Sequence, residues 1–340
     1  MRPMSVFVAW NLMAAVGALG QTPGDATIRE KVVVREVPVL ADVPAGWRGE
    51  PVPRLAERMI ALEDGAAREI SALQPVAAPA GPGYARVEVA FDAAHCRPEL
   101  ARGAALALAG QAERLVALGP VGISAWTGSG TLAPVPPTRE AAALAANLTA
   151  RAPAACASLA SEQPEHELVC PATPCLMIWV AAEWGSAADA EADLAAADAT
   201  ARALAAGGWT VLAFAPVAPS APAVHARKPE TRPGDDRSSW TINLLDPHSG
   251  EERDRAQSEA EGATDPGLAP LRRVVAATAG ELVASTDALA GGLAAIRGRS
   301  LLYYRTDRAP GGAPVRFELR ESGEGGRRLR AVEWAPALRP

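Results

Sequence analysis

Short apolar runs alternate with longer Ala- and Leu-rich segments through the middle of the chain. Four runs have the length and the β-branched or aromatic content of buried strands: residues 86–91, 121–126, 176–180 and 209–214. The segments between them have helical composition and cover residues 98–118, 138–159 and 187–206, and two more helical patterns follow at 268–277 and 286–296. This alternation predicts an α/β fold with a doubly wound, mostly parallel sheet and helices on both faces.

The segments on either side of this core favour β structure. Residues 28–75 hold a run rich in β-branched residues, Lys31–Leu40. They also hold an Asp64-Gly65 pair between two apolar runs, which is a strong hairpin signal. Residues 300–336 hold three strand-like runs separated by Gly-rich turns: 301–305, 315–320 and 329–334.

One stretch interrupts the pattern. Residues 217–267 are rich in Pro, Asp, Arg and Ser, with a single apolar island at Trp240–Leu245. This composition predicts an irregular insertion in the α/β domain, which we expect to span residues 84–298.

The first 20 residues have the pattern of a secretory signal peptide. Arg2 precedes an apolar run from Ser5 to Leu19, and Ala18-Leu19-Gly20 offers small residues for cleavage. The run is shorter than the roughly 20 residues of a membrane span, and the alternatives are an uncleaved anchor or a buried helix. We therefore expect a secreted, periplasmic or cell-envelope protein with no membrane span after cleavage of the signal.

Composition excludes two classes of protein. Hydrophobic residues make up 49% of the chain and charged residues 21%, which is too apolar for a disordered protein. The net charge of -6 argues against a nucleic-acid partner, since such proteins carry a basic surface. Aromatic residues are scarce at 4%, yet the eight tryptophans outnumber the four phenylalanines, so the Trp positions become informative.

The four cysteines allow three pairings, and the sequence does not choose among them. Cys170 and Cys175 could close a small loop on each other, or one of them could pair with Cys156. A zinc site is a poor alternative, because the spacing is not that of paired CxxC motifs.

Three stretches, taken in order, resemble secreted bacterial proteins built around a von Willebrand factor A (VWA)-related domain. The stretch Leu55–Ile70 carries Glu63-Asp64-Gly65, Val87–Asp92 looks like the first strand of an A domain, and Leu301–Leu319 looks like the closing β segment. The resemblance implies a ligand face at the carboxyl ends of the strands. It also implies that residues 28–75 and 300–336 pair into a small β module.

A domains that bind ligands through a cation present Asp-x-Ser-x-Ser after the first strand. Here that stretch reads Asp92-Ala-Ala-His95-Cys96, and the later Asp-Gly of such domains corresponds to Glu183-Trp184-Gly185. One carboxylate without the two hydroxyls cannot assemble the six oxygen ligands of Mg²⁺. We therefore expect no metal and no cofactor; the alternative is a weak site that uses Asp92, Glu183 and waters.

His95 and Cys96 are neighbours and invite a catalytic interpretation, but adjacent side chains at a strand-to-helix turn usually point apart. The sequence also lacks HExxH, GxSxG and a phosphate-binding Gly-rich loop. We therefore expect a protein that is not an enzyme.

Trp126 ends one predicted strand and Trp184 follows another. Two interpretations are open: a Trp-lined recognition surface beside Asp92 and Glu183, and the simpler one, which we favour, in which both rings belong to the core. The expected function is adhesion or protein–protein interaction without a cation. The alternatives are a structural or assembly component of the envelope with no dedicated ligand and a His/Cys enzyme.

Overall fold

The computed structural model of the chain describes residues 34–48, 50–76, 83–93, 97–127, 131–157, 166–181, 190–216, 268–309, 313–323 and 325–336. These residues belong to one compact unit, Val34–Pro340. The predicted signal peptide, the insertion at 217–267, the His95-Cys96 pair and the Glu183-Trp184 pair lie outside the described residues.

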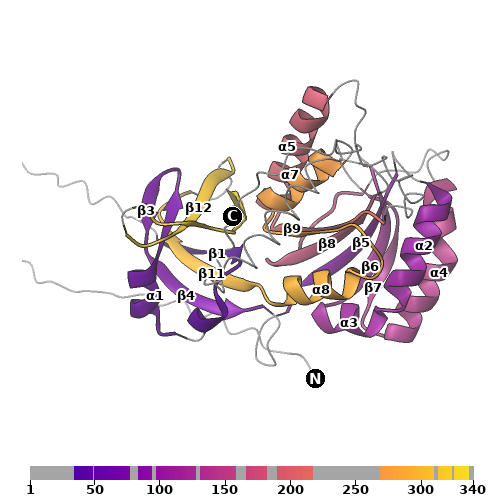
Figure 1. The fold of residues 1–340 in the computed structure, drawn as a ribbon, viewed down its shortest axis with the longest axis horizontal. Coiled ribbons are helices and arrows are strands. Elements are labelled where there is room, and N and C mark those ends of the chain that lie inside the picture. The colour runs from indigo at the N-terminus through magenta and orange to yellow at the C-terminus, as the bar shows by residue number, and fades with distance from the viewer. Residues whose placement is uncertain are drawn as a thin grey trace, which may run out of the picture. The chain divides into compact units, whose positions relative to one another are not determined.

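The chain forms a mixed α/β structure with several sheets (Figure 1). The largest sheet has six strands in the order β10-β9-β8-β5-β6-β7. Their bounds are β5 Arg86–Asp92, β6 Val121–Trp126, β7 Thr131–Thr138, β8 Cys175–Val180, β9 Trp209–Phe214 and β10 Glu281–Val283. All neighbouring pairs are parallel except β6 and β7, which are antiparallel.

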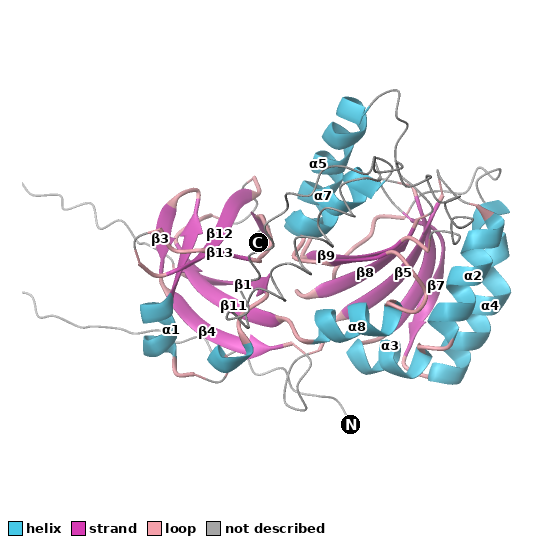
Figure 2. Ribbon diagram, in the orientation of Figure 1, coloured by secondary structure: helices cyan, strands magenta, loops and turns pink. Residues whose placement is uncertain are grey.

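Helices pack on both faces of this sheet (Figure 2). One face packs against α2 Pro98–Ala109, α3 Ala112–Leu118, α4 Ala141–Ala157 and α8 Leu289–Arg297. The other face packs against α5 Ala190–Ala206 and α7 Ala269–Ala277. Strands β5, β6, β8 and β9 are almost entirely buried because helices cover the sheet on both sides, which explains their continuous apolar runs.

The helix boundaries differ from the prediction in two places. The single helix expected over residues 98–118 is two helices, which are separated at Gly110 and Gln111. The helix expected from residue 138 begins at Ala141, because residues 131–138 form the edge strand β7. Three prolines in β7 remove backbone donors, and this restricts the segment to an edge position.

The N- and C-terminal β segments pair with each other, as expected. A three-stranded antiparallel sheet has the order β1-β11-β4, with β1 Arg35–Ala41, β11 Ser300–Thr306 and β4 Ile70–Pro75. A second antiparallel sheet has the order β13-β12-β2-β3, with β2 Met59–Glu63, β3 Ala66–Arg68, β12 Val315–Glu321 and β13 Arg328–Leu329; β14 Trp334–Ala335 pairs with β12.

The Asp64-Gly65 hairpin is confirmed. Both residues have left-handed backbone angles, with φ of 48° and 81°, and they connect β2 to β3. The interpretation of residues 28–75 as β structure throughout was wrong, since a short helix, α1 Val52–Arg58, precedes β2. Pro53 lies in its first turn, where its missing N–H costs no helical hydrogen bond.

Glu63 at the end of β2 is a buried carboxylate, with 3% of its surface exposed. It accepts hydrogen bonds from the hydroxyls of Tyr304 (2.8 Å) and Thr306 (2.6 Å), which both lie on β11. Its Oε2 forms an ion pair with Nε of Arg68 at 2.9 Å, and Arg308 lies 3.6 Å away. This network connects the β2–β3 hairpin to a strand of the other terminal sheet.

Candidate functional site

The order of the six strands reverses between β5 and β8. From β5 the chain moves to β6 and β7 on one side, and from β8 it moves to β9 and β10 on the other. In open α/β sheets, ligands bind outside the carboxyl ends of the strands at such a reversal. The candidate site is therefore built from the last residues of β5, β6 and β8.

Asp92 is the last residue of β5, and its side chain is 4% exposed. Its Oδ2 accepts a hydrogen bond from Nε1 of Trp179 on β8, with a nitrogen–oxygen distance of 3.2 Å. Trp179 pairs with Ala90 in the parallel register, so its ring lies on the same face as Asp92. Ala90, which lies beside Trp179 in the register, has a small side chain that leaves room for the indole on this face of the sheet.

Trp126 ends β6 directly opposite Asp92 in the register. Its ring meets that of Trp179 edge to face, with centroids 6.2 Å apart and an interplanar angle of 71°. We call Asp92, Trp126 and Trp179 the Asp92 cluster. Within the described part of the chain, no acceptor lies within hydrogen-bonding reach of Nε1 of Trp126.

The structure thus brings together two of the four predicted site residues, Asp92 and Trp126. Trp126 is only 4% exposed, so it contributes a core contact here and no exposed ring. The predicted partners Glu183 and Trp184 lie outside the described residues, and the two-tryptophan surface stays a prediction.

Trp179 was not singled out from the sequence, although its indole N–H serves the candidate site. The ring is in the core, at 2% exposure, but its N–H serves Asp92. One signal in the sequence could have identified it. Trp179 carries a polar N–H and is the second-to-last residue of a predicted strand, which could lie beside β5.

The described residues at this edge do not fit a divalent cation. The residues that follow β5, β8 and β9 are Ala93, Ala181 and Ala215, which bring no side-chain oxygen, while Thr127 after β6 brings one hydroxyl. No cluster of three or more His, Cys, Asp and Glu side chains suited to a metal occurs among the described residues. Mg²⁺ requires about six oxygen ligands, so the residues that surround Asp92 here are the wrong ones for it.

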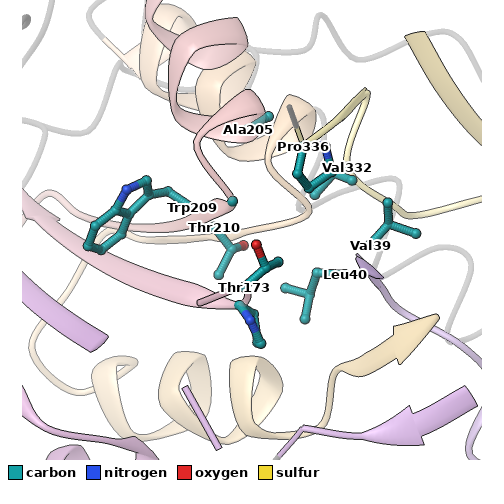
Figure 3. Close-up of a pocket in the computed structure, with 10 residues that line it drawn as sticks. Val39, Leu40, Thr173, Ala205, Trp209, Thr210, Val332 and Pro336 are labelled. Atoms are coloured by element: carbon teal, nitrogen blue, oxygen red, sulfur yellow. The ribbon is translucent and has the colours of Figure 1, made fainter. Parts of the chain in front are cut away.

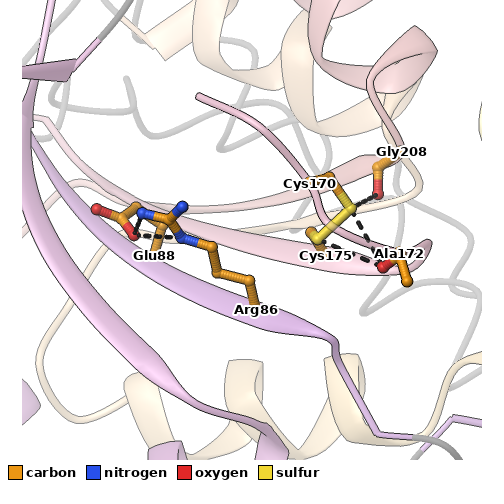
Figure 4. The surroundings of a disulfide bond; sticks show 6 residues. All are labelled: Arg86, Glu88, Cys170, Ala172, Cys175 and Gly208. Atoms are coloured by element: carbon orange, nitrogen blue, oxygen red, sulfur yellow. Dashed lines mark hydrogen bonds and ion pairs between the residues drawn. A yellow bond between two sulfur atoms is a disulfide. The ribbon is translucent and has the colours of Figure 1, made fainter. Parts of the chain in front are cut away.

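A second buried acid, Glu88, lies on the same face nearer the amino end of β5. Its Oε2 accepts hydrogen bonds from Nε and Nη2 of Arg86, at 3.0 and 2.8 Å (Figure 4). Burial raises the pKa of Glu88, while the Arg86 guanidinium acts in the opposite direction. Gly122 on β6 makes room for this pair, because a Cβ there would lie 2.4 Å from Oε2 of Glu88.

The structure joins Cys170 to Cys175 in a disulfide just before and at the start of β8 (Figure 4). Both cysteines are buried, at 2% and 0% exposure. Of the pairings open to the sequence, the small loop is the one present; Cys96 lies outside the described residues. A buried disulfide at the amino ends of the strands has a structural role and lies away from the Asp92 cluster.

A small apolar crevice also lies at the amino ends of β8 and β9 (Figure 3). Its walls include Val39 and Leu40 of β1, Thr173, Trp209 and Val332. No acid, base or thiol lines it, so we do not assign it to the candidate site.

Among the described helices, none is long and apolar enough to cross a membrane. No protein-family model matches the chain, and neither a curated protein nor a solved structure matches it.

Proposed function

We propose that the chain is a VWA-related, non-enzymatic protein that acts outside the cytoplasm and binds another protein without a cation. The observation that carries the proposal is the order of the large sheet. Numbered from β5, its strands have the order 3-2-1-4-5-6 with one antiparallel edge strand, and doubly wound sheets of this order bind ligands at the reversal. Residues 84–298 form the VWA-like domain in this proposal.

The terminal segments support the same assignment. The Glu63-Asp64-Gly65 stretch, on which the resemblance partly rests, forms a hairpin whose Glu63 is held by β11. The first and last segments of the chain thus depend on each other, as the resemblance implies for a module beside an A domain.

The chemistry of the carboxyl edge supports binding over catalysis. Asp92 is engaged by an indole and is buried, and the neighbouring strand ends are mostly alanine. Among the described residues there, no nucleophile stands beside a general base. The Cys170–Cys175 disulfide supports export, because disulfides persist mainly in oxidising compartments.

The burial of Trp126 favours a second candidate, an envelope component without a dedicated ligand. That burial removes one of the two rings expected on the recognition surface. The two candidates differ in one outcome, a saturable partner, which only the first requires.

Exposed residues at the start of the helix that follows β5 in the chain provide the test. Arg97 lies just before α2 and Glu99 lies in its first turn, and both are exposed, whereas Arg114 is exposed on α3, whose end leads to the amino edge of the sheet. Immobilised full-length protein should capture an envelope protein saturably in both EDTA and Mg²⁺. Arg97→Glu should abolish the capture, and the control Arg114→Glu should leave it intact. Capture that survives Arg97→Glu and Glu99→Arg, or none at all, would count against the proposal.

A further inference from the structure

We infer that the indole N–H of Trp179 takes the place of a divalent cation as the partner of Asp92, so the carboxyl edge is organised without metal. Trp179 is then a positioning residue, which fixes Asp92 from the neighbouring strand. The inference deepens the proposed function, because it concerns the edge where that function would reside.

Burying a carboxylate without a partner has a high cost in free energy. A buried polar group without a partner is strongly disfavoured, and an ionised carboxylate even more so. Asp92 is 4% exposed and receives the Trp179 N–H at 3.2 Å. The positive end of the N–H dipole thus partners one of the two carboxylate oxygens of Asp92.

The indole that donates to Asp92 is held rigidly. Trp179 is 2% exposed and lies within β8, and its ring packs edge to face against Trp126. A ring held by two strands and a second indole cannot move aside at low cost, because the interior is close-packed. The donor is therefore in place before any ligand arrives.

The side chains at this edge do not suit a metal. Of the described residues that follow the strand ends beside Asp92, Ala93 and Ala181 offer no side-chain oxygen and Thr127 offers one hydroxyl. Asp92 and Trp179 also interact with groups outside this pair, so the test must isolate the single N–H.

The chain supplies a matched control for that purpose. Trp209 is as buried as Trp179 and belongs to the same apolar cluster, but its Nε1 has no hydrogen-bond acceptor among the described residues. Trp179→Phe and Trp209→Phe remove the same atoms, and only the first removes a hydrogen bond to a carboxylate. A double-mutant cycle with Asp92→Ala then measures the coupling.

We expect Trp179→Phe and Asp92→Ala to be coupled by about 10- to 100-fold in the unfolding equilibrium constant measured in urea. Trp209→Phe and Asp92→Ala should combine as independent changes. Additive effects for the Trp179 pair would overturn the inference.

A second measurement does not depend on the alanine variant folding. In an ¹H–¹⁵N spectrum of the full chain, the indole resonance missing in Trp179→Phe should be the one that shifts in Asp92→Asn. The Trp209 resonance, assigned in the same way, should stay in place. An unmoved Trp179 resonance would overturn the inference.

The metal itself gives the third readout. The melting temperature of the wild-type protein should be the same in EDTA and in millimolar Mn²⁺. A Mn²⁺-dependent rise that Asp92→Asn abolishes would overturn the inference. If Trp179 and Asp92 are coupled but no partner is captured, the inference stands and the proposed function fails. If a partner is captured but the two residues are not coupled, the proposed function stands and the inference fails.

Discussion

Glu63 offers a quantitative test of how the terminal segments hold together. Its side chain is 3% exposed and accepts two hydroxyl hydrogen bonds, from Tyr304 at 2.8 Å and Thr306 at 2.6 Å. It also forms an ion pair with Arg68 at 2.9 Å. Glu63→Ala removes all three, together with the 3.6 Å ion pair to Arg308, and leaves the buried hydroxyls of Tyr304 and Thr306 without this acceptor. Arg68, whose side chain is 26% exposed, keeps its ion pair with Asp307 at 3.0 Å.

Breaking one side of a buried ion pair costs about 3 to 5 kcal/mol, and we expect a loss of this size in the free energy of unfolding. The control is Glu69→Ala, next to the same hairpin. Glu69 is 66% exposed and pairs with Arg305, which is 47% exposed. Exposed pairs contribute about 0 to 1 kcal/mol, so this loss should be small.

Urea denaturation monitored by far-UV circular dichroism measures both variants. We expect the urea concentration at the unfolding midpoint to be clearly lower for Glu63→Ala and almost unchanged for Glu69→Ala. Equal losses in the two variants would refute the reasoning, because they would mean that the buried network does not join the terminal segments.

Three further predictions follow from single sites. Burial raises the pKa of Glu88, so the folded state holds its proton more tightly than the unfolded state does, and ionisation costs stability as pH rises from about 4. Glu88→Gln cannot ionise, so its stability relative to the wild type should rise as the pH rises from about 4 to 7. A difference that stays constant across this range in urea melts would contradict the prediction. Gly280→Ala should destabilise the fold by more than about 3 kcal/mol, because its Cβ would clash with a backbone carbonyl of β9, whereas Gly291→Ala on α8 has open space and should be neutral or stabilising. Thermal melts of the two variants decide this, and similar losses would refute it. Replacing Cys170 and Cys175 together by Ser opens a short loop and should cost about 2 kcal/mol of unfolding free energy, and an unchanged midpoint in urea would contradict that estimate.

The sequence was most informative where burial leaves a continuous apolar run. Residues 121–126 and 209–214 were predicted to be strands with the bounds that the structure gives, because strands covered on both faces must be apolar throughout. The Asp64-Gly65 turn was equally predictable from the sequence, since few other residue pairs adopt its φ angles.

The sequence was least informative where partners lie far apart in the chain. Strand β7 carries three prolines and resembles a loop, and β10 has only three residues, so neither was expected. The hydrogen bond from Trp179 to Asp92 depends on which strands are neighbours and in what register. Local sequence patterns do not contain that information, so Trp179 was not connected with Asp92 from the sequence.

Calorimetric titration of the full-length protein with Mg²⁺ and Mn²⁺ tests the central claim most directly. The claim is that the edge around Asp92 is organised by the Trp179 indole and has no place for a divalent cation. The account predicts only the heat of dilution for both ions. Micromolar binding of either ion that disappears in Asp92→Asn would contradict it.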